Sequence, residues 1–125
     1  ISDWFVVTTP RTPETRGLVD RRLLGLLKGS AYIIIISRGG IVDEAPLLEA
    51  LQSRQIAGAA FDTFTKEPLP ENSPFWDLDN VVITAHTSAH TPQLDIGRRK
   101  ILKENLRRYL AKEPFIRVVD KKAGF

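Results

Sequence analysis

Short apolar runs alternate with stretches of helical period along this chain, and each change of period marks a predicted element. The apolar runs at 5–9, 31–36, 56–64 and 81–84 predict four strands. Helices are expected at 20–28, from 43 onwards, and from 91 until Pro114. Strands and helices therefore alternate, with one long loop at 65–79 before the fourth strand.

Polar residues and prolines mark the expected helix ends. Asp20 is expected to cap the first helix and Asp43 the second, which tolerates Pro46 in its first turn. Thr91 and Pro92 open the last helix. Leucines at helical spacing give the first two helices a buried face: Leu23, Leu24 and Leu27 in the first, and Leu47, Leu48 and Leu51 in the second.

The connections between the predicted strands are too long for hairpins, which favours βαβ units and a parallel sheet. The run 31–36 is continuously apolar and rich in isoleucine, so it is expected to be a central strand that is buried on both faces. The expected fold class is α/β: a partial doubly wound, Rossmann-like parallel sheet of about four strands with flanking helices.

Composition adds limits to this fold. A chain of 125 residues is long enough for one domain with a core, and the absence of cysteine excludes disulfides and thiolate metal ligands. The net charge of +3 comes mainly from basic residues at 98–122, whose helical spacing indicates a solvated helix face rather than a nucleic-acid site. No run is apolar enough for a membrane span, and no secretion signal opens the chain, so a cytoplasmic location is expected.

Four polar residues follow predicted strands, where ligands bind to sheets of this kind. Arg38 offers a fork for a carboxylate, with a structural ion pair as its alternative. His86 is either a proton donor or a hydrogen-bonded side chain, and a nearby Glu67 would stabilise its imidazolium and orient its ring. Asp62 accepts a hydrogen bond from a ligand amide or caps the loop that follows its strand.

Other residues in these loops have simpler interpretations. His86 and His90 are four residues apart but flank a strand-to-helix turn, so no metal site is expected. Phe75 and Trp76 are expected to pack in the core, with a pocket-shaping role as the alternative.

Three linked segments resemble the signatures of the D-isomer-specific 2-hydroxyacid dehydrogenases: 37–44 (Ser-Arg-Gly-Gly-Ile-Val-Asp-Glu), 61–70 (Phe-Asp-Thr-Phe-Thr-Lys-Glu-Pro-Leu-Pro) and 84–86 (Thr-Ala-His). Their order and spacing match, and the likeness extends over essentially the whole chain. Ile35, Ala85 and Ala89 depart from the usual pattern, and none of these departures removes a proposed catalytic group.

The resemblance implies a role for each residue. Arg38 would bind the substrate's carboxylate and carbonyl, His86 would protonate the carbonyl oxygen, and Glu67 would support His86. The cofactor would be NAD or NADP, and the substrate a small 2-oxo acid such as glyoxylate or hydroxypyruvate. Residues expected to contact the dinucleotide are Pro10, Thr12, Thr15, Ile36, Ser37, Arg38, Asp62 and Ser88.

The family's glycine-rich phosphate loop and its substrate-binding domain find no counterpart in residues 1–125. The chain is therefore expected to be the C-terminal portion of a dinucleotide-binding domain, truncated, and unable to retain the cofactor or turn over alone. The alternative is a non-catalytic dimerisation or corepressor-like interaction domain of the same family. An uncovered sheet edge and apolar face also predict a homo-oligomer.

Overall fold

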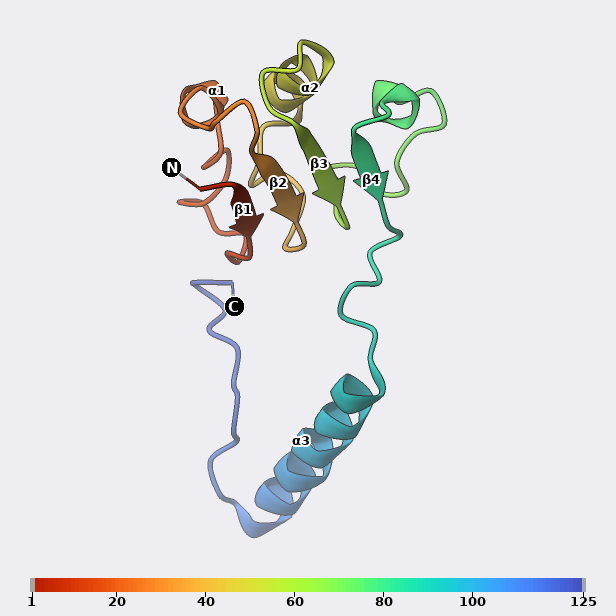
Figure 1. Cartoon of the computed structure of the whole chain (residues 1–125). Coiled ribbons are helices and arrows are strands. Elements are labelled where there is room, and N and C mark those ends of the chain that lie inside the picture. The colour runs from red at the N-terminus through yellow and green to blue at the C-terminus, as the bar shows by residue number, and fades with distance from the viewer. Residues whose placement is uncertain (1, 125) are drawn as a thin grey trace. The chain divides into compact units, whose positions relative to one another are not determined.

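The computed structural model describes residues 2–124, which form two compact units divided between Ser88 and Ala89. In the described part of the first unit, four strands are connected by two α-helices and one 3₁₀ helix. The described part of the second unit contains one long helix (Figure 1).

The first unit is built on a parallel sheet in the order β1-β2-β3-β4. The strands are β1 (Trp4–Val7), β2 (Tyr32–Ile35), β3 (Gly58–Phe61) and β4 (Val81–Ile83). All four arrows point to the same edge of the sheet (Figure 1). The predicted α/β class and the four parallel strands are confirmed. Each strand is shorter than its predicted run: all four end earlier than predicted, and β2 and β3 also begin later.

One face of the sheet carries the core. Ile33 of β2 is fully buried, as are Leu47 and Leu51 of α2 (Glu44–Gln52). The predicted buried face of α2 is therefore confirmed in part, since Leu48 is only partly buried against this core. Apolar side chains at helical spacing on α2 thus meet alternate side chains of the strands, as burial of apolar surface requires.

The first helix ends earlier than the sequence predicted. The Asp20 carboxylate accepts a hydrogen bond from the Leu23 amide at 2.8 Å, so the predicted cap is present. α1 spans only Arg21–Leu24, however, and Gly25 follows as its C-cap. Glycine in a second helical turn is unfavourable, and the amides of Leu26 and Leu27 bond three residues back instead of four. The prediction of a helix to residue 28 was therefore wrong.

The second helix starts where expected but without the expected cap bond. Asp43 occupies the N-cap position of α2, yet its side chain makes no capping hydrogen bond. Pro46 lies in the first turn and is buried, as predicted.

The prediction that β2 is buried on both faces was wrong for this unit. β2 does lie between β1 and β3, but only Ile33 and Ile35 are buried, whereas Tyr32 is 41 % exposed. The Tyr32 ring stacks on the Trp4 ring with centroids 4.9 Å apart. The side chains of β2 that are not fully buried lie on the face of the sheet that α1 and α2 do not cover.

The loop between β3 and β4 is ordered by aromatic side chains. It contains the 3₁₀ helix η1 (Pro74–Asp77), whose Phe75 is buried against Phe61 and Phe64 with ring centroids 5.0 Å and 5.7 Å away. Trp76, by contrast, is 51 % exposed and donates its indole N–H to the Pro70 carbonyl at 2.9 Å. Core packing is thus confirmed for Phe75 and not for Trp76.

The second unit is formed by α3 (Pro92–Ala111) and the segment after it. The Thr91 hydroxyl caps the helix by accepting from the Leu94 amide at 3.1 Å, and Lys112 ends it in the left-handed conformation with φ 55°. The predicted start is confirmed, and the helix ends three residues before Pro114. No helix in residues 2–124 is both long and apolar enough to cross a membrane.

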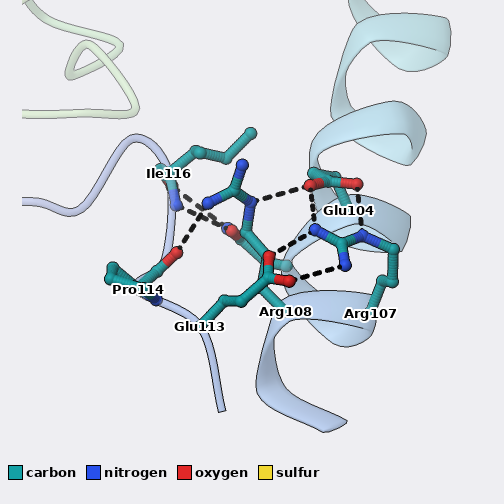
Figure 2. A network of polar contacts seen from close by, with 7 residues as sticks. Glu104, Arg107, Arg108, Glu113, Pro114 and Ile116 are labelled. Carbon is teal, nitrogen blue, oxygen red and sulfur yellow. Dashed lines mark hydrogen bonds and ion pairs between the residues drawn. The ribbon is translucent and has the colours of Figure 1, made fainter. Parts of the chain in front are cut away.

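An ion-pair network holds the chain after α3 against the helix (Figure 2). Arg107 pairs with both Glu104 and Glu113, and Arg108 pairs with Glu104 and donates to the Pro114 carbonyl at 3.0 Å. These contacts place Arg107 and Arg108 in pairs at the surface of α3, in agreement with the predicted solvated face.

Candidate active site

The carboxyl ends of the parallel strands bring the predicted site residues to one edge of the first unit. Ser37 and Arg38 follow β2, Asp62 follows β3, and His86 lies three residues after β4. Glu67 reaches this edge from the loop that follows β3. Polar side chains at this edge of a parallel sheet are the usual position of a ligand site.

Glu67 and His86 are in direct contact. The Glu67 Oε2 and His86 Nδ1 atoms are 2.8 Å apart, and Glu67 Oε1 accepts a hydrogen bond from the Phe64 amide at 2.9 Å. The His86 side chain remains 43 % exposed. The contact that sequence reasoning left open is therefore present, with a carboxylate that is itself fixed by the backbone.

The pKa of Glu67 is lowered from its ordinary value of 4.5. The hydrogen bond from His86 is the largest cause, burial partly opposes it, and the Phe64 amide adds to it. The carboxylate is therefore ionised at neutral pH, where it can stabilise positive charge on the imidazole ring.

Asp62 is bound to the segment that contains His86. Its carboxylate, in a residue only 3 % exposed, accepts hydrogen bonds from the Thr84 hydroxyl at 2.6 Å and the Thr87 amide at 2.9 Å. The Ser88 hydroxyl donates to it at 2.6 Å, and the Ser88 amide also contacts both oxygens. All of these donors belong to the segment after β4 rather than to the loop after β3, and contact of Asp62 with a ligand amide stays a prediction.

The pKa of Asp62 is lowered to about 2. Burial alone would raise the pKa, but the hydrogen bonds from Ser88 and Thr84 and from the Thr87 amide outweigh it. Charge-assisted hydrogen bonds of this kind are among the stronger ones in proteins. Asp62 is thus a buried, permanently charged anchor at neutral pH.

Arg38 lies at the same edge without a recorded contact to Glu67 or His86. Its exposed guanidinium donates to the Ser37 carbonyl at 2.7 Å, and no ion pair of Arg38 occurs within residues 2–124. The structural ion pair weighed above is therefore not found in the described chain. An exposed, unpaired guanidinium remains available to an anionic ligand.

Gly39 links the Arg38 segment to the Glu67 loop. A Cβ atom at Gly39 would overlap the carbonyl group of Phe64 and the amide of Thr65, so only glycine permits this approach. The Thr65 amide in turn donates to the Glu44 carboxylate at the start of α2. The two segments are consequently held as one rigid edge.

A cavity of about 570 Å³ adjoins the Glu67–His86 pair. Its walls include Phe64, Leu69 and Trp76 as well as the two polar residues, so it is largely apolar with a few polar groups. This is the composition of small-molecule sites. The pocket-shaping alternative for Trp76 thus has a structural basis.

The remaining predicted ligand contacts lie at the ends of β1 and β2. Thr15 donates its hydroxyl to the Pro10 carbonyl at 2.7 Å and accepts from the Thr12 amide at 2.7 Å, which closes the turn. Ile36 is 42 % exposed, and Ser37 is buried.

Three hydroxyl groups at this edge are buried without a hydrogen-bond partner in the described chain. They are Thr9 Oγ1, Ser37 Oγ and Thr63 Oγ1, which follow β1, β2 and β3 respectively. Buried polar groups are normally paired, so unpaired hydroxyls along the carboxyl edge fit a polar ligand that extends across the strands. A dinucleotide is a ligand of this shape and polarity.

Several of these contacts were missed by sequence reasoning. Thr84 lies two residues before His86, and its position at a strand end was an available signal. The roles of Gly39 and Glu44 depend on which loops meet, which no local pattern reveals. In the part of the chain that the structure describes, no group of three or more potential ligands is placed to hold a metal ion.

The parallel sheet, with polar side chains gathered at the carboxyl ends of its strands, has the architecture of a dinucleotide-binding domain of the Rossmann type. Residues 1–88 match the family model described as "D-isomer specific 2-hydroxyacid dehydrogenase, NAD binding domain". The chain belongs to the D-isomer specific 2-hydroxyacid dehydrogenase family.

Relatives with known names agree with this family. Glyoxylate/hydroxypyruvate reductase B of Pectobacterium carotovorum is 48 % identical over 90 residues, which are 72 % of this chain and 28 % of that enzyme. The chain thus spans less than a third of that relative's length.

Two solved structures share the fold across nearly the whole chain. A D-isomer specific 2-hydroxyacid dehydrogenase from Xanthobacter autotrophicus, in complex with NADPH and MES, has a TM-score of 0.88 at 43 % identity and covers 99 % of this chain and 50 % of its own. The NADPH-dependent glyoxylate/hydroxypyruvate reductase of Sinorhizobium meliloti, in complex with NADP and sulfate, has a TM-score of 0.89 at 35 % identity over 99 % of this chain and 40 % of its own.

Proposed function

We propose that this protein is an NAD(P)-dependent oxidoreductase that reduces a small 2-oxo acid to a D-2-hydroxy acid. The observation that carries this proposal is the contact between Glu67 and His86 at the carboxyl edge of the sheet. A carboxylate that orients an imidazole is the arrangement expected of a general acid acting on a carbonyl oxygen.

His86 is the proposed proton donor. Because Nδ1 is engaged by Glu67, the proton transfer is assigned to Nε2, the other ring nitrogen. Glu67 holds the ring and stabilises the imidazolium before the proton is donated. When bound, the nicotinamide cofactor supplies the hydride for the carbonyl carbon.

Arg38 is the proposed binding group for the substrate's carboxylate and carbonyl. Its guanidinium is exposed at the ligand edge and has no carboxylate partner in the described chain. A planar guanidinium binds a carboxylate through two parallel hydrogen bonds, which also fixes the substrate's orientation.

The proposed cofactor is NAD or NADP, bound along Pro10, Thr12, Thr15, Ile36, Ser37, Arg38, Asp62 and Ser88. The unpaired hydroxyls of Ser37 and Thr63 support a polar ligand there. Glyoxylate and hydroxypyruvate are the proposed substrates, by analogy with the reductases named above. The cytoplasmic location stays a prediction.

We assign turnover to a longer protein and expect the 125-residue chain alone to retain little cofactor and little activity. Two facts support this: the 125 residues contain no glycine-rich phosphate loop, and they span half or less of the relatives described above.

The test is to titrate NADH and NADPH into this chain and into any longer product of its gene, and then to assay glyoxylate and hydroxypyruvate reduction. Binding of either cofactor and reduction of a 2-oxo acid by the longer product are expected. If the longer product binds neither cofactor, the dehydrogenase proposal is wrong. Robust turnover by residues 1–125 alone would overturn the proposal that they are insufficient.

A second candidate function is a non-catalytic association domain. The observation that favours it is the exposed apolar surface on the sheet, where Trp4, Val6 and Val82 are 62 %, 46 % and 62 % exposed. Association through this surface would also give the predicted homo-oligomer. Light scattering after size exclusion tests both ideas, because a monomeric mass at high concentration contradicts them.

A further inference from the structure

We propose that Asp62 is a positioning residue for His86. It accepts hydrogen bonds from the chain on both sides of the histidine, which keeps the His86 ring in contact with Glu67. The inference rests on the proposed role of His86 as proton donor. It assigns to Asp62 a function in addition to the proposed contact with the cofactor.

The backbone of His86 has a conformation that needs support. Its φ angle is 55°, in the left-handed region that residues with a side chain rarely adopt. Such conformations persist where surrounding contacts hold them in place. His86 therefore needs anchors close to it on the chain.

Asp62 supplies these anchors from a neighbouring strand. The Thr84 hydroxyl, two residues before His86, lies 2.6 Å from Asp62 Oδ1. The Thr87 amide, one residue after His86, lies 2.9 Å from the same oxygen, and the Ser88 hydroxyl lies 2.6 Å from Oδ2. One carboxylate thus fixes the segment at 84 and at 87–88, and His86 is the residue between the two attachments.

The bonds of the Asp62 carboxylate are all directed at this one segment. A carboxylate has about four lone-pair sites, and four different donors of residues 84, 87 and 88 contact the two oxygens. The residue is also only 3 % exposed. These contacts join Asp62 to the chain on both sides of His86, which favours the positioning role.

The titration of the Glu67 carboxyl group distinguishes positioning from simple electrostatics. The hydrogen bond from His86 lowers the pKa of Glu67, while the negative charge of Asp62 has a small raising effect. Asp62→Asn removes that charge, which by itself lowers the pKa of Glu67 further. If the variant also releases His86, loss of the hydrogen bond raises the pKa of Glu67 towards 4.5. The two explanations therefore predict shifts of opposite sign.

The experiment is carbon-detected NMR of the Glu67 carboxyl group in the full chain, without cofactor or substrate. For Asp62→Asn we expect an upward shift of the Glu67 midpoint and loss of the His86 Nδ1 proton signal. An unchanged or lower midpoint with that proton signal retained overturns the proposal. Asp79→Asn is the matched control, because it makes the same chemical change in an exposed ion pair with Arg54 and should leave Glu67 unaffected.

Thr84→Val provides a second measurement if Asp62→Asn fails to fold. It removes one hydroxyl donor and keeps the Asp62 charge, so the Glu67 midpoint should rise by less, and no change counts against the proposal. Both readouts need neither NADH nor a 2-oxo acid. Failure of the longer gene product to bind either cofactor would thus defeat the proposed function alone, and an unmoved Glu67 midpoint would defeat the positioning role alone.

Discussion

Gly39 and Phe64 approach each other so closely that a methyl group on Gly39 would overlap the Phe64 carbonyl. The amide of the same Phe64 donates to Glu67, which in turn contacts His86. The loop that carries Arg38 and the loop that carries the acid–base pair are therefore joined through one backbone contact. Absence of a side chain at Gly39 is what allows the site to be assembled.

Gly39→Ala is expected to destabilise the protein and to disturb Glu67 together with Arg38. Overpacking of this kind costs about 1–3 kcal/mol, and relief of the overlap must move either loop. Chemical denaturation measures the loss. Gly97→Ala is the control, because a Cβ atom at Gly97 would meet nothing within 4 Å. Gly97 lies inside α3, where alanine is the better helix former. Equal effects of the two variants would contradict the importance of the Gly39 contact.

In the longer gene product, Glu67→Gln is expected to lower kcat by roughly 100-fold with little change in KM, since the charge that stabilises the imidazolium is lost while substrate contacts remain. The sign of the pH effect follows from the lowered pKa of Glu67. A depressed carboxyl pKa means that the charged form persists in mild acid and is lost only at a pH below the ordinary value of 4.5. The wild-type rate should fall there, and the variant should lack this acid limb in steady-state assays.

Much of this arrangement could be predicted from the sequence, for identifiable physical reasons. Short apolar runs, one of them rich in isoleucine, predicted the parallel strands, and Asp20 and Thr91 predicted two helix starts, because these signals act within a few residues. The premature end of α1 at Gly25 was missed because leucine periodicity continues past the glycine.

The sequence indicated which residues form the candidate site, but not the hydrogen bonds that hold them in place. Arg38, Glu67 and His86 were chosen by their positions after strands, which a parallel sheet brings to one edge. The Thr87 and Phe64 donors are backbone amides, which leave no mark on residue identity. The bonding of Asp62 was undecided for the same reason.

Asp62→Asn is expected to reduce stability in a pH-dependent way. The pKa of Asp62 is about 2 in the folded protein and ordinarily 3.8, so its stabilising effect is complete above about pH 4 and is lost as pH falls towards 2. Thermal unfolding of both proteins from pH 7 to pH 2 measures this. The difference in Tm should be largest near neutral pH and should shrink in acid. A difference that does not depend on pH would argue against the ionised carboxylate as its source.

Arg38→Lys and His86→Gln should separate substrate binding from proton transfer. Lysine keeps the positive charge but loses the planar fork, so KM for the 2-oxo acid should rise by roughly 10-fold or more while kcat falls less. Glutamine at 86 cannot donate a proton as an acid does, so kcat should fall by about 100- to 10,000-fold.

Because Arg38 has no ion-pair partner within residues 2–124, its replacement should leave Tm nearly unchanged. Steady-state kinetics of the longer gene product with glyoxylate, alongside thermal unfolding, measures both variants. Equal and small kinetic effects would contradict both assignments, and a large loss of Tm for Arg38→Lys would mean that the guanidinium serves the fold rather than the substrate.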